Sequence, residues 1–405
     1  MERVILHCDC NSFFASVETA LNPAYKDVPM AVCGRTEDRH GIVLAKNDLA
    51  KRFGIQTAET VYSAKKKCPN LQICDPHYDE YAKYSKMVNK IYFEYTDLVE
   101  PFGIDESWLD VTASQRLFGS GENIAEQIRQ RVKTEIGITV SIGVSFNKVF
   151  AKLGSDYKKP DAITVISREN FKDLVFPLPA ADLLFVGKKT TQVLATMGVR
   201  TIGNLANTSR ELLKMRLGKM GEMLHDYANG NDNSAVEIPL EDGIKSISNG
   251  FTFKHDLASR EECRAGIDFL CDEIGRRLRS KSLKCTTIAL TIKDVYLKSI
   301  QRQRTLVNST DVSREISKVA YDILCEEWDP SKLIRMLTVS VSGLLEATSA
   351  YTQMNLFDDP DEDRSGKERV REKAVDQIRT KFGISSISTG AIIDSDIGVF
   401  VSNKK

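Results

Sequence analysis

The stretch His7-Cys8-Asp9-Cys10-Asn11-Ser12-Phe13-Phe14-Ala15-Ser16-Val17-Glu18 places a carboxylate between a predicted strand and a predicted helix. Residues 4–8 form an apolar run typical of a buried strand, and residues 11–21 have helical spacing that ends at Asn22-Pro23. A polar group at the end of a buried strand can face a cleft. Asp9 is therefore a candidate catalytic residue.

Strands and helices continue to alternate over the first part of the chain. Further strands are predicted at 30–33, 42–45, around 99–112 and at 138–144, and helices at 47–53, 79–95 and 122–136. This alternation predicts an α/β or α+β domain over about 165 residues. Between 177 and 230 the pattern changes to short helices broken by glycines.

A second β-rich region begins at residue 244. Strands are predicted at 247–254, 286–294, 303–306 and 336–344, with helices at 260–278 and 311–325. The order strand–helix–strand–strand–helix–strand predicts a ferredoxin-like module. The acidic run at 358–363 is expected to be a flexible linker, and a short amphipathic segment at 372–382 follows it without an assigned role.

Two adjacent acids occur in Gly103-Ile104-Asp105-Glu106-Ser107-Trp108-Leu109-Asp110. Adjacent carboxylates repel each other unless a positive charge lies beside them, and a divalent cation is the simplest one. Together with Asp9 they would suit Mg²⁺, which prefers oxygen ligands. On spacing alone, an ordinary turn with two solvated acids is the favoured alternative.

The overall charge gives no sign of a nucleic-acid partner, because the 56 basic residues balance the 56 acidic ones. Residues 276–304, however, contain nine cations and one acid, Asp294. Such a stretch could bind a phosphate backbone, although a solvated helix face and loop is an equally good interpretation.

Cysteine usage and hydropathy bear on the compartment. Nine cysteines lie at 8, 10, 33, 68, 74, 263, 271, 285 and 325 without a CxxC pair, which favours buried thiols in a reducing compartment over disulfides or a zinc site. The chain begins without a signal-like segment and contains no long apolar run. We expect a cytoplasmic protein, associated with the nucleoid if it binds DNA, with no membrane partner.

A third block, Ser145-Phe146-Asn147-Lys148-Val149-Phe150-Ala151-Lys152-Leu153-Gly154-Ser155-Asp156 followed by Lys158-Lys159-Pro160, completes a set of motifs. In order and spacing, residues 7–18, 103–110 and this block resemble the three motifs of Y-family DNA polymerases, and the resemblance extends over about residues 1–357. It implies an α+β multidomain, right-hand polymerase. The expected parts are a ferredoxin-like palm with small fingers (1–166, fingers about 20–75), a helix-hairpin-helix thumb (167–235), a ferredoxin-like little finger (244–345) and a C-terminal tail (346–405).

The resemblance also implies roles for the residues of these motifs. Asp9, Asp105 and Glu106 would be the catalytic, metal-binding carboxylates, and the Cys10 carbonyl would be a backbone ligand. The metals would be two Mg²⁺ ions, with Mn²⁺ able to substitute. The incoming nucleotide would meet four residues, Phe13, Phe14, Lys51 and Lys159, and Phe14 would be the steric gate that excludes a 2′-hydroxyl.

Two positions depart from the family's pattern. Many members place Tyr and Arg against the triphosphate where Asp48 and Lys51 stand here, which puts the grip on the nucleotide in doubt. Residues 186–205 resemble a helix-hairpin-helix motif, and Phe185 stands where that motif usually has its first glycine. The reaction class is unaffected by either change.

DNA and clamp contacts are expected outside the palm. DNA would be held by the thumb turn and by the cationic stretch of the little finger, through Gly187, Lys188, Lys189, Arg276, Arg277, Arg302 and Arg304. The peptide Gln353-Met354-Asn355-Leu356-Phe357 looks like the one that docks on the bacterial sliding clamp, through Gln353, Leu356 and Phe357. Packing of this peptide against the body of the protein is its alternative interpretation.

The favoured function is template-directed, error-prone translesion synthesis by a monomer. It would transfer a nucleotide from a dNTP to the 3′-hydroxyl of primer-template DNA, by a two-metal mechanism and without proofreading. One alternative is a DNA- and clamp-binding accessory protein with weakened catalysis. Another is a different two-metal enzyme, such as a nuclease or a cyclase, which would leave the thumb, the little finger and the clamp-like peptide unexplained.

Overall fold

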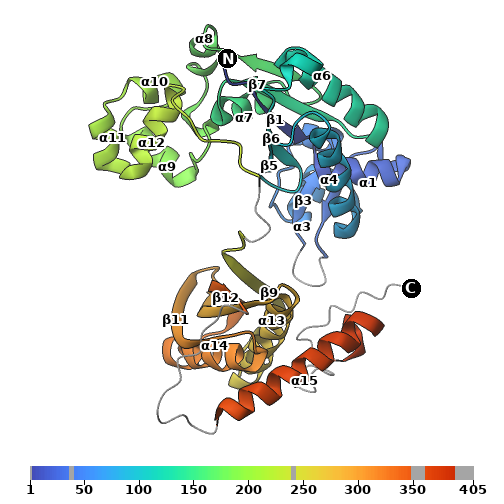
Figure 1. Ribbon diagram of the computed structural model, residues 1–405, viewed down its shortest axis with the longest axis vertical. Coiled ribbons are helices and arrows are strands. Elements are labelled where there is room, and N and C mark those ends of the chain that lie inside the picture. The colour runs from blue at the N-terminus through green and yellow to red at the C-terminus, as the bar shows by residue number, and fades with distance from the viewer. Residues whose placement is uncertain (1, 36–40, 239–242, 348–360, 388–405) are drawn as a thin grey trace. The chain divides into compact units, whose positions relative to one another are not determined.

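The computed structural model describes residues 2–35, 41–238, 243–347 and 361–387. The chain divides into two compact units, one of residues 1–34 and 41–240 and one of residues 241–405 together with 35–40 (Figure 1). In the described part of the chain, no helix combines the length and the apolar character that crossing a membrane requires.

The first unit is built on a five-stranded sheet of order β5-β6-β1-β7-β8. Its strands are β1 (Ile5–Cys10), β5 (Val99–Pro101), β6 (Glu106–Asp110), β7 (Val140–Ser145) and β8 (Ile163–Ile166). With α4 (Tyr78–Phe93) between β1 and β5, and α6 (Gly121–Arg131) between β6 and β7, the order β7-β1-β6-β5 is that of a split βαβ, ferredoxin-like sheet. Because β1 and β6 are antiparallel, the end of one meets the start of the other.

Helices cover both faces of this sheet. Tyr81 and Ile91 of α4 and Ile124 of α6 pack with Leu6 of β1 in one hydrophobic cluster. Helix α7 (Lys148–Tyr157) contacts β7, β1 and β8. At Gly143 of β7 a Cβ would lie 1.8 Å from the Ala151 carbonyl of α7, so this helix can approach the sheet only over a glycine. Short elements α5 (Gln115–Phe118) and η2 (Val132–Ile136) flank α6.

A smaller sheet of order β3-β2-β4 corresponds to the expected fingers. Its strands are β2 (Met30–Cys33), β3 (Val43–Lys46) and β4 (Gln72–Cys74), and its helical elements are α1 (Phe13–Leu21), η1 (Pro23–Tyr25), α2 (Asp48–Arg52) and α3 (Val61–Lys67). It has its own apolar core, which includes Val43, Ile55 and Leu71.

The region of short helices predicted between 177 and 230 is confirmed. It contains η3 (Ala180–Asp182), α9 (Lys188–Thr196), α10 (Ile202–Asn207), α11 (Arg210–Leu217) and α12 (Lys219–Ala228), and α8 (Phe171–Val175) precedes it. Leu194, Ile202, Leu213 and Leu224 are fully buried in a cluster that also includes Phe150 of α7. These helices therefore share one core with the palm helix.

The second unit contains the predicted β-α-β-β-α-β module. Its elements are β9 (Ser246–Leu257), α13 (Arg260–Ser280), β10 (Leu283–Asp294), β11 (Ser299–Thr310), α14 (Ser313–Glu327) and β12 (Ile334–Glu346). The strands are antiparallel in the order β11-β10-β12-β9, and both helices pack on the same apolar core of the sheet. The strands are longer than the sequence predicted, because polar residues alternate with apolar ones toward their ends.

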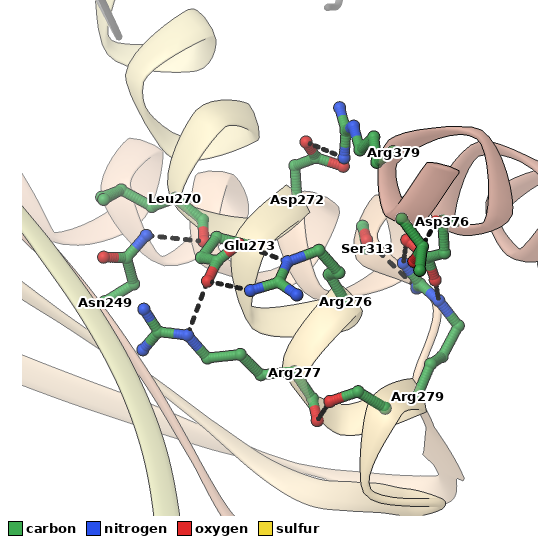
Figure 2. Close-up of polar contacts among 12 residues, drawn as sticks. Asn249, Leu270, Asp272, Glu273, Arg276, Arg277, Arg279, Ser313, Asp376 and Arg379 are labelled. Carbon is green, nitrogen blue, oxygen red and sulfur yellow. Dashed lines mark hydrogen bonds and ion pairs between the residues drawn. The ribbon is translucent and has the colours of Figure 1, made fainter. Parts of the chain in front are cut away.

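Helix α15 (Asp361–Phe382), followed by η4 (Ile384–Ser386), packs against α13. The expectation of a flexible linker through residue 363 is wrong for residues 361–363, which begin this helix. Its contacts are ionic, with Arg279 of α13 binding Glu372 and Asp376, and Arg379 binding Asp272 at 2.8 Å (Figure 2). Apolar periodicity could not reveal this interface, since the helix docks through its charged face.

Candidate active site

The three predicted catalytic acids line one cavity of about 570 Å³ in the first unit. Asp9 in β1 lies directly opposite Glu106 in β6, and the Cys10 amide donates to the Asp105 carbonyl at 2.9 Å. A nitrogen of His7 and carboxylate oxygens of Asp9 and Glu106 lie within 4.8 Å of one another. The antiparallel pairing of β1 and β6 therefore brings together acids that are far apart in the sequence.

The electrostatics of the cluster reflect this crowding. Burial, with the negative charges of Asp9 and Glu106, raises the pKa of Asp105 to about 6. Burial also raises the pKa of Asp9, although Lys159 opposes the shift. Burial would raise the pKa of Glu106 as well, but hydrogen bonds from His7 and Lys152 outweigh it and lower that pKa to about 2.

The donor set fits a hard divalent cation. The acids offer several oxygens around one cavity, and both burial and the charges of Asp9 and Glu106 raise the pKa of Asp105, so a cation there would stabilise the ionised carboxylate. Burial raises the pKa of the Cys10 thiol well above its ordinary value. Of the groups of Cys10, only the backbone carbonyl is therefore suited to Mg²⁺.

Lysines neutralise the acids from one side of the cavity. Lys159 Nζ lies 2.7 Å from Asp9 and 2.7 Å from Asp156, and Lys152 Nζ lies 2.5 Å from Glu106. The sequence assigned Lys159 to the triphosphate but gave Lys152 no role. Its position one helical turn after Lys148 in the third motif is the signal that could have found it.

The finger helix α2 contributes Lys51, which lines the cavity together with Lys46. Asp48, the departure from the family's tyrosine, does not line it. Its carboxylate is 54% exposed and binds Lys51 at 2.8 Å. The acid is thus turned away from the cavity and holds Lys51 in an ion pair.

Phe13 and Phe14 differ in burial. Both line the cavity, but Phe13 is 3% exposed and belongs to the palm core, whereas the Phe14 ring is only partly buried. The Phe14 ring stacks on Tyr81 of α4 with centroids 4.1 Å apart and an interplanar angle of 11°. Tyr81 was missed by the sequence analysis, because nothing in the spacing of α4 marks the residue that meets α1.

His7 is a second functional residue that the sequence analysis did not single out. It is fully buried, with Nδ1 at 2.8 Å from the Ser155 hydroxyl and Nε2 at 3.3 Å from Glu106. This arrangement holds Glu106 from behind the cavity. A polar residue inside the apolar run 4–8 was the available signal.

The thumb turn has the geometry of a helix N-terminus open to an anion. Gly187 is the N-cap of α9 and brings no side chain to that end, while Lys188 and Lys189 form the first turn. Phe185 adopts a positive φ of 69°, so the chain keeps the left-handed backbone of a glycine at this departure from the family's pattern.

The four predicted DNA-binding arginines of the little finger do not form one stripe. Arg276 and Arg277 of α13 both bind Glu273 at 2.7 Å (Figure 2). Arg302 and Arg304 of β11 bind Glu327 and Glu326 of α14. Each of these arginines thus has an acidic partner on the helical side of the module.

The opposite face of the little-finger sheet has no charged side chain over three cross-strand rows, and most residues in these rows are polar. The rows are Gln301–Thr291–Thr338–Gly250, Gln303–Ala289–Ser340–Ser248 and Thr305–Thr287–Ser342–Ser246. Their neighbours along the strands, such as Ile288, Leu290 and Val339, point into the core. The predicted clamp-binding residues Gln353, Leu356 and Phe357 lie outside the described residues.

Comparisons with known proteins identify the family of the chain. Residues 8–156 match the family model "impB/mucB/samB family", residues 244–356 match "impB/mucB/samB family C-terminal domain", and residues 181–232 match "DNA polymerase-iota, thumb domain". DNA polymerase IV of Acetivibrio thermocellus is 48% identical over 97% of this chain and 98% of its own length. DNA polymerase IV of Clostridium acetobutylicum is 36% identical over 98% of this chain and 100% of its own length.

Among solved structures, a chimera of Y-family DNA polymerases has a TM-score of 0.76 at 20% identity, covering 84% of this chain and 99% of the chimera. This likeness shows the fold, and the relatives show the family. The chain belongs to the impB/mucB/samB family, the Y family of DNA polymerases, and is a DNA-directed DNA polymerase.

Proposed function

We propose that this polymerase performs template-directed, error-prone translesion synthesis by two-metal nucleotidyl transfer. The observation that carries the proposal is the meeting of Asp9, Asp105 and Glu106 at one cavity that lysines also line. Two Mg²⁺ ions held by these acids and the Cys10 carbonyl would activate the primer 3′-hydroxyl and stabilise the leaving pyrophosphate.

The chain's own residues would prepare the site for the nucleotide. Lys159 would release Asp9 and bind the triphosphate of the nucleotide. Its ammonium group would act there as a compact point charge. Lys51 would do the same once it leaves Asp48. His7 and Lys152 would hold the Glu106 carboxylate in place, which keeps the geometry of the site before the substrate arrives.

Phe14 would act as the steric gate. Its ring is fixed by stacking on Tyr81 and has little freedom to yield, so a 2′-hydroxyl beneath the sugar would collide with it. Phe13 also lines the cavity, so it would meet the nucleotide beside Phe14 while its ring supports that of Phe14.

DNA would be bound through its backbone. The open N-terminus of α9 at Gly187, with Lys188 and Lys189, suits a phosphate. The hydroxyl and amide groups on the open face of the little-finger sheet suit a duplex without reading its bases. Arg302 and Arg304 on the edge strand are candidates for binding DNA phosphates, which would displace Glu327 and Glu326 from them. Arg276 and Arg277 share one carboxylate and are weaker candidates for phosphate binding.

The remaining parts of the proposal concern the cellular context. We expect a monomer that works at the nucleoid, docks on the sliding clamp through residues 353–357 and lacks proofreading. Among the described residues, the possible metal-binding groups are the active-site cluster and one cluster containing a cysteine and a histidine, which is unlike an exonuclease site of carboxylates. An accessory protein with weakened catalysis is favoured only by the Asp48–Lys51 pair and by Phe185.

Primer extension in Mg²⁺ tests the catalytic assignment. Asp105→Asn should reduce extension by about 100-fold or more, because a metal ligand that stabilises transition-state charge is lost. Glu94→Gln, which changes a surface acid bound to Arg131, is the matched control and should extend like the wild type. Equal extension by Asp105→Asn would refute the site, and DNA binding without extension by the wild type would favour the accessory protein.

A further inference from the structure

A second cluster of metal-ligating side chains lies in the first unit, apart from the three catalytic acids. Glu18 of α1, Cys74 at the end of β4 and His77 at the start of α4 each offer one ligand atom, and these atoms lie within 4.8 Å of one another. Glu18 and Cys74 are buried, while the His77 ring is 58% exposed. The cluster thus has two fixed ligands and one at the surface.

The donor set is one that zinc prefers. Thiolate, imidazole and carboxylate are the three ligand types found at Zn²⁺ sites, and Cys74 and His77 have the two-residue separation that places neighbouring ligands on one ion. The sequence has neither a CxxC pair nor HExxH-like spacing, and a Cys-x-x-His pair whose third ligand lies in a helix far upstream is not recognisable from spacing alone.

We propose that Glu18, Cys74 and His77 form a Zn²⁺ site, with Cys74 Sγ, His77 Nδ1 and a Glu18 carboxylate oxygen as ligands. The exposure of His77 leaves a path for the ion and for a water as the fourth ligand. For the three ligand atoms to reach one ion, the main movement required is a rotation of the His77 side chain, which is the least buried of the three. Glu18 and Cys74 lie on regular elements that fix their positions.

The surroundings of Glu18 support the assignment. The Tyr81 hydroxyl donates to Glu18 Oε1 at 2.5 Å, which orients the carboxylate in the way that hydrogen-bonding partners orient the ligands of metal sites. His77 Nδ1 lies 2.9 Å from Oε1 and 3.1 Å from Oε2. Zn²⁺ would replace this contact and would balance a buried carboxylate whose only cationic partner among the described ion pairs is an exposed histidine.

The site would be coupled to the nucleotide cavity through Tyr81. The hydroxyl of this residue binds Glu18 and its ring stacks on Phe14, so an ion on Glu18 would restrain the residue that supports Phe14. A competing explanation is that Glu18, His77 and Tyr81 form only a hydrogen-bonded network. Such a network needs no thiolate, because a protonated Cys74 can donate to the Asp75 carbonyl at 3.3 Å and hydrogen-bond to Glu18. The thiolate therefore distinguishes the two explanations.

Spectroscopy of the full-length protein with Co²⁺ tests the proposal. Co²⁺ is the probe, and excess Mg²⁺ keeps the carboxylate cluster occupied. The wild type should develop a thiolate-to-cobalt charge-transfer band that Zn²⁺ abolishes. In Cys74→Ser the band should vanish, and in His77→Ala cobalt should bind about tenfold more weakly or worse. Cys68→Ser, which changes another buried cysteine of the fingers, is the matched control and should retain the band.

Two further measurements test whether the variants still fold and which thiolate binds the cobalt ion. Cys74→Ser should keep wild-type primer extension in Mg²⁺ but lose the rise in melting temperature that Zn²⁺ gives the wild type. A band that persists in Cys74→Ser and disappears in Cys10→Ser would place the thiolate at the catalytic cluster and overturn the proposal. Absence of any charge-transfer band in the wild type would overturn it as well.

Discussion

Phe13 and Phe14 are adjacent in the sequence and both line the cavity of the three acids, yet only Phe13 is almost fully buried. Successive positions on an α-helix point about 100° apart, so α1 turns Phe13 into the palm core and Phe14 toward the carboxylates. The stack on Tyr81 then fixes the Phe14 ring. A small side chain at this position would open space beneath the sugar of an incoming nucleotide.

Phe14→Ala should therefore admit ribonucleotides, and we expect the preference for dNTP over rNTP to fall by about tenfold or more. Single-nucleotide incorporation with each substrate measures the ratio. Phe53→Ala removes an exposed ring of the fingers and serves as the control. Unchanged sugar discrimination in Phe14→Ala would remove the gate role from this residue.

Phe185 provides a test of backbone strain in the thumb. Its φ of 69° lies in the left-handed region, which disfavours residues with a Cβ, and its ring is 50% exposed. Phe185→Gly and Phe185→Ala both remove the ring. The difference between their free energies of unfolding therefore measures the cost of the left-handed backbone for a residue with a Cβ. We expect the glycine variant to be more stable by about 0.5–1 kcal/mol in denaturant unfolding. An alanine variant of equal or greater stability would contradict this account.

Among the elements, α14 depends on a distant helix for its N-terminal cap. Its N-cap residue Val312 has no side-chain acceptor, and the Glu372 carboxylate of α15 accepts from the Ser313 amide and hydroxyl at 3.0 Å each. The same carboxylate binds Arg279, whose side chain is 4% exposed and whose guanidinium also donates to the Asp311 carbonyl at 2.9 Å. Helix α15 is thus part of the second unit's structure.

Glu372→Ala should destabilise this unit by about 2–3 kcal/mol, because it removes a helix cap and leaves a buried guanidinium with fewer partners. Hydrogen exchange should show the loss of protection in the first turn of α14 and in α15. Lys373→Ala, at the exposed neighbouring position, should leave both unchanged. Equal protection in the two variants would mean that the docking of α15 contributes nothing to α14.

The whole molecule divides its tasks between two units. The acids, the lysines and Phe14 that line the cavity all lie in the first unit. The second unit contains the little finger, α15 and, between them in the sequence, the clamp-like peptide. If the proposed clamp contact holds, we expect it to be separable from nucleotide transfer.

Deleting Gln353–Phe357 should abolish the stimulation of synthesis by the sliding clamp while distributive primer extension stays at the wild-type level. Two apolar anchors, Leu356 and Phe357, would be lost, and such residues supply most of the affinity of short peptides. The comparison variant Asp358→Ala/Asp359→Ala changes the adjacent acids and should retain stimulation. Clamp-stimulated synthesis by the deletion variant would assign the clamp contact to another part of the chain.

The local pattern of the sequence determined the elements. Apolar runs and helical spacing predicted β1, β2, α13 and the β-α-β-β-α-β order of the little finger, because period and capping depend on residues a few positions apart. The three polymerase motifs likewise identified Asp9, Asp105 and Glu106, which the sheet then brings together. The short elements α3, β4 and β8 were not predicted, since three to seven residues give too little periodicity.

Only the tertiary structure decided which side chains from different elements meet. Lys152 on Glu106, Tyr81 beneath Phe14, Glu372 on the N-terminus of α14 and His77 beside Glu18 all join residues that no local pattern relates. The tertiary structure also divides the cationic stretch of the little finger. Arg276 and Arg277 bind Glu273, whereas Arg302 and Arg304 bind acids of α14. The physical reason is that such contacts depend on the distance and angle at which whole elements pack, and the core that sets these is shared by residues from the entire unit.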